Sequence, residues 1–155
     1  MSSPVIASKL AQENLLESPD RQLAANKRLV YDMYRAIVQG GQADRAIEFF
    51  TEAYIQHNPN IASGRDELER FLRGSRPARP LEDRIVLPLL DIIAERDMVL
   101  VVNQRPEKDA AGESYITTWF DYYRIEDGKI AEHWDPALKS ADMLKFDPNS
   151  KRTDQ

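Results

Sequence analysis

Apolar residues in the first half of the chain recur at steps of three and four positions. In the segment 22–38 the recurring positions are Leu23, Val30, Met33, Tyr34, Ile37 and Val38. This spacing places them on one side of an α-helix, so the pattern predicts an amphipathic helix that ends before Gly40. Similar spacing predicts shorter helices over 43–50 and 65–73, with a short extended segment over 54–58 between them.

After residue 84 the pattern changes to runs that are rich in β-branched and aromatic residues. These runs cover 84–94, 98–105, 114–125 and 129–135. Their composition is typical of strands, and the polar turns between them predict an antiparallel meander. Helices followed by strands predict an α+β fold in which three N-terminal helices pack on one face of the sheet. A last short helix is predicted over 138–144.

The ends of the chain differ from its middle in composition. Both ends are rich in polar residues, so we expect a loosely ordered leader over 1–20 and a flexible tail over 147–155. Residues 21–146 are then one domain. A chain of 155 residues is long enough to bury roughly two-thirds of its unfolded surface.

Charge and cysteine content argue against several classes of protein. With 21 Lys and Arg against 26 Asp and Glu, the net charge is −5, which gives no basic surface for nucleic acid. The absence of cysteine removes disulfides and thiolate metal ligands. No apolar run approaches the ~18 residues of a membrane span, and the N-terminus lacks the features of a signal peptide. We therefore expect a cytoplasmic protein with no nucleic-acid or membrane partner.

The last hairpin determines which side chains share a face of the sheet. Residues 125–129 suit a three-residue loop with a left-handed glycine, which pairs Ile125 with Lys129 and, further along, Asp121 with His133. One face then carries Trp119, Asp121, Tyr123, His133 and Asp135. The opposite face carries Phe120, Tyr122, Arg124, Ile130, Glu132 and Trp134.

The face with the two aspartates is too polar for a plain core and too aromatic for a free solvent face. Burying ionisable groups costs several kcal/mol unless they are paired. The cluster therefore predicts a solvated or ligand-filled cavity. An alternative is that Asp121 and His133 form a purely structural cross-strand pair, and the spacing leaves both interpretations open.

Two segments carry a family resemblance: YIQHNP (54–59) and FDYYRIEDGKIAEHWD (120–135). Together with the order of the elements, they resemble the SnoaL-like polyketide cyclases of the nuclear-transport-factor-two-like superfamily, over about 23–135. The resemblance implies a cone-shaped, cystatin-like α+β barrel in which a curved antiparallel sheet encloses a deep pocket. It also implies a homodimer through the outer face of the sheet, where Tyr122 and Trp134 lie.

The same resemblance implies roles for individual residues. The catalytic acid/base aspartate of the cyclases falls on Asp135, and their supporting histidine falls on Asp121, so this chain departs there and carries its histidine at 133 instead. In the related ketosteroid isomerases, the groups that hold the enolate oxygen fall on Tyr34 and Asp121. Their catalytic base falls on Asn58, which argues against isomerase chemistry of that kind.

The implied reaction is an intramolecular aldol condensation on an apolar or polyketide-like carbonyl compound, with no metal or organic cofactor. A carboxylate such as Asp135 would remove the proton next to the carbonyl, and His133 or His57 would share it. Tyr34 and Asn58 are candidate donors to the oxygen that gains charge. The candidate walls of the binding site are Trp119, Tyr123 and Phe71, with Asn103 also facing the substrate.

Each assignment has a structural alternative. His57 could cap the turn before Pro59, and Tyr34 could belong to the core. Arg105, two positions after Asn103 on its strand, is a further candidate to face the cavity, but it could equally end a solvated strand. His57, His133 and Asp135 have the types of metal ligands, but their spacing supports no metal site. At the level of function, the alternatives are a hydrolase or dehydratase that uses the same residues, and a non-catalytic small-molecule-binding or dimeric interaction domain of the same fold.

Overall fold

Helices precede the meander in the chain, as the sequence predicts. The computed structural model describes residues 6–150. The helical elements are α1 (Lys9–Leu15), α2 (Arg21–Met33), η1 (Tyr34–Gln39), η2 (Ala43–Arg45), α3 (Ala46–Phe49), α4 (Arg65–Ser75) and η3 (Ala141–Lys145). The strands are β1 (Phe50–Gln56), β2 (Leu89–Glu95), β3 (Met98–Lys108), β4 (Ser114–Glu126) and β5 (Lys129–Trp134). No helix among residues 6–150 is long and apolar enough to cross a membrane.

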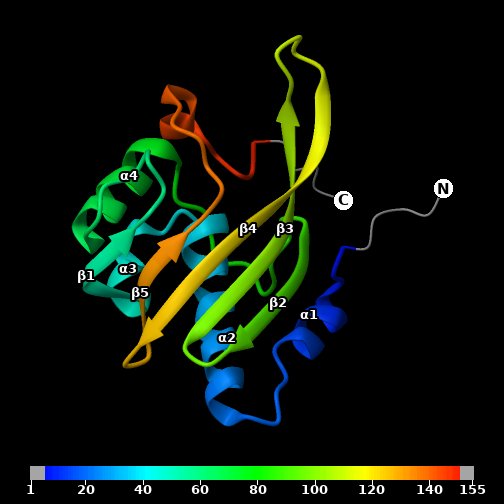
Figure 1. Cartoon of the computed structure of the whole chain (residues 1–155), viewed down its shortest axis with the longest axis vertical. Coiled ribbons are helices and arrows are strands. Elements are labelled where there is room, and N and C mark those ends of the chain that lie inside the picture. Colours follow the sequence, from blue (N-terminus) through cyan, green and yellow to red (C-terminus); the bar gives the residue numbers. More distant parts are fainter. Residues whose placement is uncertain (1–5, 151–155) are drawn as a thin grey trace, which may run out of the picture.

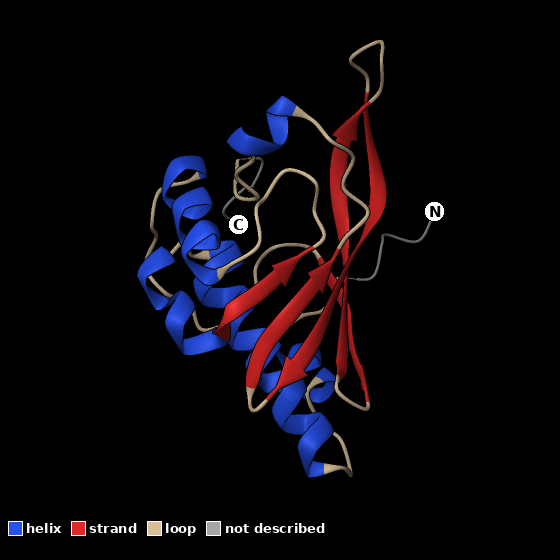
Figure 2. Cartoon of the chain, turned by 60° about the vertical axis from the view of Figure 1, so that its left-hand side comes forward, coloured by secondary structure: helices blue, strands red, loops and turns tan. Residues whose placement is uncertain are grey.

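The five strands form one curved sheet in the order β1-β5-β4-β3-β2. The helices pack on one face of it, with α2 running behind the strands (Figures 1 and 2). The α+β class is thereby confirmed. The sheet is not wholly antiparallel, because the segment expected over 54–58 is longer and pairs with β5 in parallel as an edge strand. The sheet also remains open, because β1 and β2 form its two edges.

The long N-terminal helix is continuous from Arg21 to Gln39 but changes its winding at Tyr34. The Asp20 carboxylate caps its start by accepting from the backbone of Gln22 and Leu23. From Tyr34 onward the chain forms a π-helical turn, a wider winding that is often found at functional sites.

The tight turn of the last hairpin differs from the prediction. The loop has two residues, Asp127 and Gly128, with φ of 48° and 72°, and Glu126 pairs with Lys129. Two successive positive φ values define a type I′ turn, whose twist matches that of the strands. Ile130, which was predicted on the outer face, is fully buried.

A β-bulge after this turn restores the predicted alternation. Ile125 pairs with Ile130 but Arg124 pairs with Glu132, so Ala131 is an extra residue on β5. Tyr123 therefore lies opposite His133, in the place predicted for Asp121. Without the extra residue, His133 would point to the outer face, because side chains alternate along a strand.

Both ends of the described chain are packed rather than loose. The side chain of Gln12 in α1 is buried, donates to the carbonyls of Ala7 and Ile85, and accepts from the Tyr31 hydroxyl. The leader, which is expected to be loosely ordered, therefore contains a packed helix, α1; residues 1–5 lie outside the described chain. In the tail, Asn149 is buried and donates to the Gln39 carbonyl; residues 151–155 lie outside the described chain.

Strand β2 starts at Leu89 rather than at the predicted position 84. The backbone N–H groups of Ile85 and Val86 bond to the side chains of Gln12 and Gln39 instead of to a neighbouring strand. Ile85 and Leu87 are buried there, but as part of an irregular segment next to the helices. Hydrophobicity alone does not distinguish these two arrangements.

Candidate functional site

A cavity of about 170 Å³ lies between the inner face of the sheet and the helices. This is far more than the ~10–15 Å³ that one water molecule requires. Nine of the ten residues predicted for the site line it: Tyr34, Asn58, Phe71, Asn103, Trp119, Asp121, Tyr123, His133 and Asp135. Most of the other lining residues are apolar, among them Ile37, Leu68, Leu72 and Met143.

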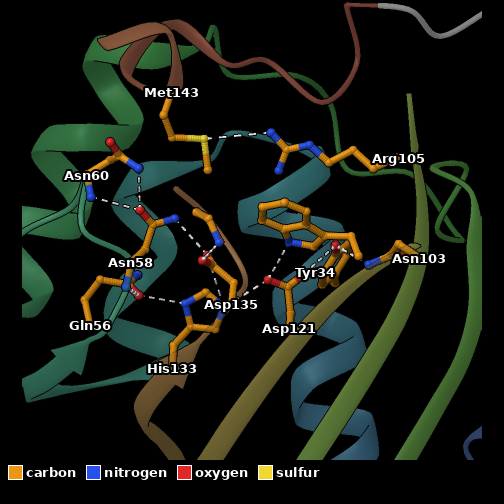
Figure 3. A network of polar contacts seen from close by, with 12 residues as sticks. Tyr34, Gln56, Asn58, Asn60, Asn103, Arg105, Asp121, His133, Asp135 and Met143 are labelled. Carbon is orange, nitrogen blue, oxygen red and sulfur yellow. Dashed lines mark hydrogen bonds and ion pairs between the residues drawn. The ribbon is translucent and has the colours of Figure 1, made fainter. Parts of the chain in front are cut away.

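Asp121 on β4 is the centre of a buried hydrogen-bond network (Figure 3). Its Oδ1 contacts Trp119 Nε1 at 3.3 Å and His133 Nε2 at 2.9 Å. Its Oδ2 accepts a hydrogen bond from the Tyr34 hydroxyl at 3.1 Å. Three side chains from three different elements therefore converge on one carboxyl group.

The protons on His133 follow from its second neighbour, Gln56. The Gln56 Oε1 atom accepts from the backbone N–H of Asn58 at 3.0 Å, which fixes the orientation of the amide. His133 Nδ1 lies 2.8 Å from the same oxygen, so Nδ1 must carry a hydrogen and donate it. The short contact between Nε2 and Asp121 then requires a second hydrogen. His133 and Asp121 therefore share one proton.

The Tyr34 side chain is neutral, and its contacts show which way its hydroxyl hydrogen points. Its oxygen accepts from Asn103 Nδ2 at 2.7 Å, so its hydrogen points to Asp121. Burial, followed by the charge of Asp121, raises the pKa of Tyr34 well above its usual range. The other amide atom of Asn103, Oδ1, is buried without a hydrogen-bond partner among the described residues.

Asp135 follows directly after β5 and accepts two hydrogen bonds. Its Oδ1 accepts from the backbone N–H of Ala137 at 2.9 Å, and its Oδ2 accepts from Asn58 Nδ2 at 2.8 Å. Asn58 is held in turn by two donors of Asn60. His133 Nε2 is 4.0 Å from Asp135 Oδ2. Asp135 is thus a buried carboxyl group close to the nitrogen, His133 Nε2, that takes part in the shared proton.

The predicted donors to a substrate oxygen already have acceptors. The Tyr34 hydroxyl donates to Asp121 and the Asn58 amide donates to Asp135. In this structure Tyr34 therefore positions Asp121, and Asn58 positions Asp135. Figure 3 draws both hydrogen bonds as dashed lines. The predicted walls are in place, and the Tyr123 ring is stacked on the His133 ring with the centroids 4.7 Å apart.

His57 does not belong to the cavity, contrary to the prediction. Its side chain is 42% exposed and its Nε2 contacts Glu132 Oε1 at 2.7 Å. Its ring stacks on the Trp134 ring of the outer face at 4.8 Å. Consecutive residues of an extended segment point to opposite sides, so His57 and Asn58 cannot both face one cavity. The hydrogen bond from His57, together with Arg124, lowers the pKa of Glu132.

Sequence reasoning missed three lining residues that bear on chemistry. Gln56 was detectable from the same alternation that removes His57, since it lies two positions before Asn58. Arg76 and Phe146 had no signal, because only the folded chain brings them to the cavity. The guanidinium of Arg105 lies between two rings, with Cζ 3.8 Å from the centre of Trp119 and 4.3 Å from that of Phe146.

Asp121, His133 and Asp135 could also bind a metal ion by their chemistry. Each offers one ligand atom, and these atoms lie within 4.8 Å of one another. One imidazole and two carboxylates suit zinc or iron. In the present geometry His133 Nε2 is engaged with Asp121, so a metal would have to displace the shared proton. That the protein works without a metal stays a prediction.

Comparison with known proteins gives one family match. The model of the SnoaL-like domain family matches residues 30–133, a range that includes Tyr34, Asp121 and His133. Among curated proteins, no match was found.

Solved structures share the fold at low sequence identity. A nuclear-transport-factor-two-like protein of unknown function from Burkholderia pseudomallei has 17% identity over 79% of this chain and 97% of its own, with a TM-score of 0.53. A putative SnoaL-like polyketide cyclase from Jannaschia sp. CCS1 has 16% identity over 77% of this chain and 90% of its own, with a TM-score of 0.51. A protein with a cystatin-like fold from Xanthomonas campestris has 22% identity over 82% of this chain and 98% of its own, with a TM-score of 0.50.

Proposed function

The chain belongs to the SnoaL-like domain family, and from this premise we propose that it is an acid/base enzyme that needs no cofactor. Its substrate would be a small apolar or polyketide-like carbonyl compound, and the reaction an aldol-type ring closure. One observation carries this proposal: the Asp135 carboxyl group faces an apolar cavity beside a proton that His133 and Asp121 share. The name of the Jannaschia relative, a putative polyketide cyclase, agrees with it.

In the proposed reaction, Asp135 acts as the base. It takes the proton from the carbon next to a carbonyl, and the electron pair of that C–H bond moves to the carbonyl oxygen as an enolate. The enolate carbon then attacks a second carbonyl of the same molecule, which forms the new C–C bond and an alkoxide. The alkoxide takes the proton of the Asp121–His133 pair, and Asp135 returns its own proton to that pair.

The surrounding residues suit this division of roles. Asn58 and the Ala137 backbone hold Asp135 in a fixed orientation, which lowers the cost of positioning the base. Tyr34 and Trp119 steady the charge that develops on Asp121 when the pair gives up its proton. Asn103 Oδ1, buried without a partner among the described residues, can accept a hydrogen bond from a substrate hydroxyl.

Exchange of α-protons tests the role of Asp135. We expect the wild-type protein to accelerate deuterium exchange at the α-carbon of an apolar benzo-fused ketone, 2-tetralone, in D₂O. Asp135→Asn should lower this exchange by about 10²-fold or more, because the base is lost while the shape of the site is kept. The measurement is the loss of the α-proton signal in ¹H NMR.

Asp142→Asn is the matched control, because Asp142 is exposed and outside the cavity. This variant should exchange the α-protons of the ketone at the wild-type rate. A wild-type protein that binds 2-tetralone without exchanging its protons would contradict the proposal and favour the alternative, a non-catalytic binding domain.

A further inference from the structure

Arg76 is a positively charged group of the cavity wall, opposite in sign to Asp135. It follows directly after α4, and its Nη1 donates to the Val38 carbonyl at 2.9 Å. Its Cζ lies 5.9 Å from the centre of the Phe71 ring. Val38 is one turn beyond Tyr34 on the same helix, so the guanidinium lies on the Tyr34 side of the cavity.

Arg76 differs from neighbouring arginines because it has no carboxylate partner. Arg105 forms an ion pair with Glu107, and Arg79 forms one with Asp147. Within residues 6–150, no carboxylate lies in ion-pair distance of Arg76. Arg76 is half-buried, and even partial burial of a charge is costly unless something compensates it.

The charge of Arg76 persists at neutral pH. Burial lowers its pKa to about 10, against a smaller opposing effect of Asp147. A guanidinium with this pKa still carries its proton near pH 7. Arginine also presents several N–H donors in one plane, which match the two oxygens of a carboxylate. The Nη1 of Arg76 donates to the Val38 carbonyl and its Nε to the Ser75 hydroxyl at 3.4 Å. Among residues 6–150, Nη2 has no hydrogen-bond acceptor.

We propose that Arg76 binds a carboxylate of the substrate, so that the cavity takes aromatic or polyketide-like carboxylic acids in their anionic form. The apolar walls would hold the carbon skeleton, and the guanidinium would hold its charged end on the side of Tyr34. This inference rests on the proposed function only in placing the substrate in the same cavity. It adds the substrate class, which fixes the direction in which the molecule enters.

A pair of probes that differ only in charge tests the inference. 2-Naphthoate and 2-naphthamide have the same ring system and nearly the same shape. By isothermal titration calorimetry at pH 7, we expect the wild-type protein to bind the naphthoate at least ~10-fold more tightly than the amide. Arg76→Gln should bind the two probes equally, and Arg76→Lys should keep part of the preference because it keeps the charge.

Arg73→Gln is the matched control, since it removes the same charge from α4 at an exposed position outside the cavity. It should keep the wild-type preference. The inference is overturned if the wild type does not prefer the naphthoate, if neither probe binds, or if Arg76→Gln retains the preference. The comparison of the two probes on the wild type needs no variant, so it stands even where Arg76→Gln does not fold.

Failure of this inference can be told apart from failure of the proposed function. Asp135→Asn should keep the preference for the naphthoate while it loses α-proton exchange on the neutral ketone 2-tetralone. A protein that exchanges the ketone but binds both naphthalene probes equally would keep the acid/base function and lose the carboxylate site. The reverse result would keep the carboxylate site alone.

Discussion

At the scale of single residues, the site depends on the orientation of one amide. Gln56 accepts from the Asn58 backbone and therefore cannot donate to His133. This one constraint assigns both ring nitrogens of His133 and leaves a proton between the imidazole and Asp121. The composition of the cluster was predictable from the sequence, because alternation from a three-residue loop places Asp121, His133 and Asp135 on one face. In the structure a two-residue turn and a bulge together give the same face. The proton was not predictable, because it depends on Gln56, which lies 77 positions from His133.

Buried tyrosines make alkaline stability a test of the packing around the site. Burial raises the pKa of Tyr34, Tyr54 and Tyr123 well above the usual value near 10. The unfolded chain therefore loses these protons first. The free energy of unfolding should be level up to about pH 9.5 and then fall by ~1.4 kcal/mol per pH unit for each tyrosine. The pKa of Arg76, about 10, lies below its value in the unfolded chain, so above this pH its titration favours the folded state and offsets the loss of stability from one of the three tyrosines.

Urea unfolding at several pH values between 8 and 11 measures this dependence. Tyr123→Phe should make the slope of stability against pH shallower by the ~1.4 kcal/mol per pH unit that one tyrosine contributes. Tyr115→Phe, at an exposed position, should leave the slope as it is. A stability curve that stays flat to pH 11 in the wild type would contradict the burial of these phenols.

At the scale of elements, the order and type of the helices and strands followed from the apolar pattern, but their joints did not. The helix over 22–38 and the meander after 84 were predictable because each has a long, regular period. The Asp127-Gly128 turn was ambiguous between two- and three-residue loops. The bulge at Ala131 has no signal of its own, yet it decides whether His133 faces inward. Parallel pairing of β1 with β5 is likewise a property of the assembled sheet.

Two glycines should respond to alanine with opposite signs. Gly128 has φ of 72°, a conformation that an L side chain adopts only with strain, although a Cβ there would meet no atom within 4 Å. Gly128→Ala should therefore lower the free energy of unfolding by about 1 kcal/mol. Gly74 lies in α4, and a Cβ there would also meet no atom within 4 Å. Gly74→Ala should raise it by about 0.5–1 kcal/mol, because alanine favours the helix.

Chemical denaturation of the two variants beside the wild type gives both values. Since neither substitution creates a contact, the difference between them reports backbone conformation alone. Equal effects of the two substitutions would mean that the turn does not have the type I′ conformation.

At the scale of the whole molecule, the sheet separates two surfaces with different character. Its inner face closes the cavity with the helices. Its outer face carries a row of partly exposed apolar residues on paired strands: Ile93, Leu100, Tyr122 and Trp134. Phe120, beside this row, is 46% exposed. We propose that a second copy of the chain covers this face, which leaves both cavities free.

Charge placed on the outer face tests this arrangement. Light scattering coupled to size exclusion should give a dimer for the wild type and a monomer for Tyr122→Glu, because a carboxylate would have to be buried in the interface. Tyr115→Glu, at an exposed position off this row, should remain dimeric. A wild-type protein that is monomeric at tens of micromolar would refute the dimer and leave the account of the cavity unaffected.

The proton that His133 and Asp121 share is the central feature of the site, and ¹⁵N NMR of the imidazole rings observes it directly. The chain has two histidines, and the exposed His57 serves as an internal reference. We predict a protonated Nδ1 on His133 and a downfield proton signal at its Nε2 that disappears in Asp121→Asn. A His133 ring whose Nδ1 carries no proton would contradict the network.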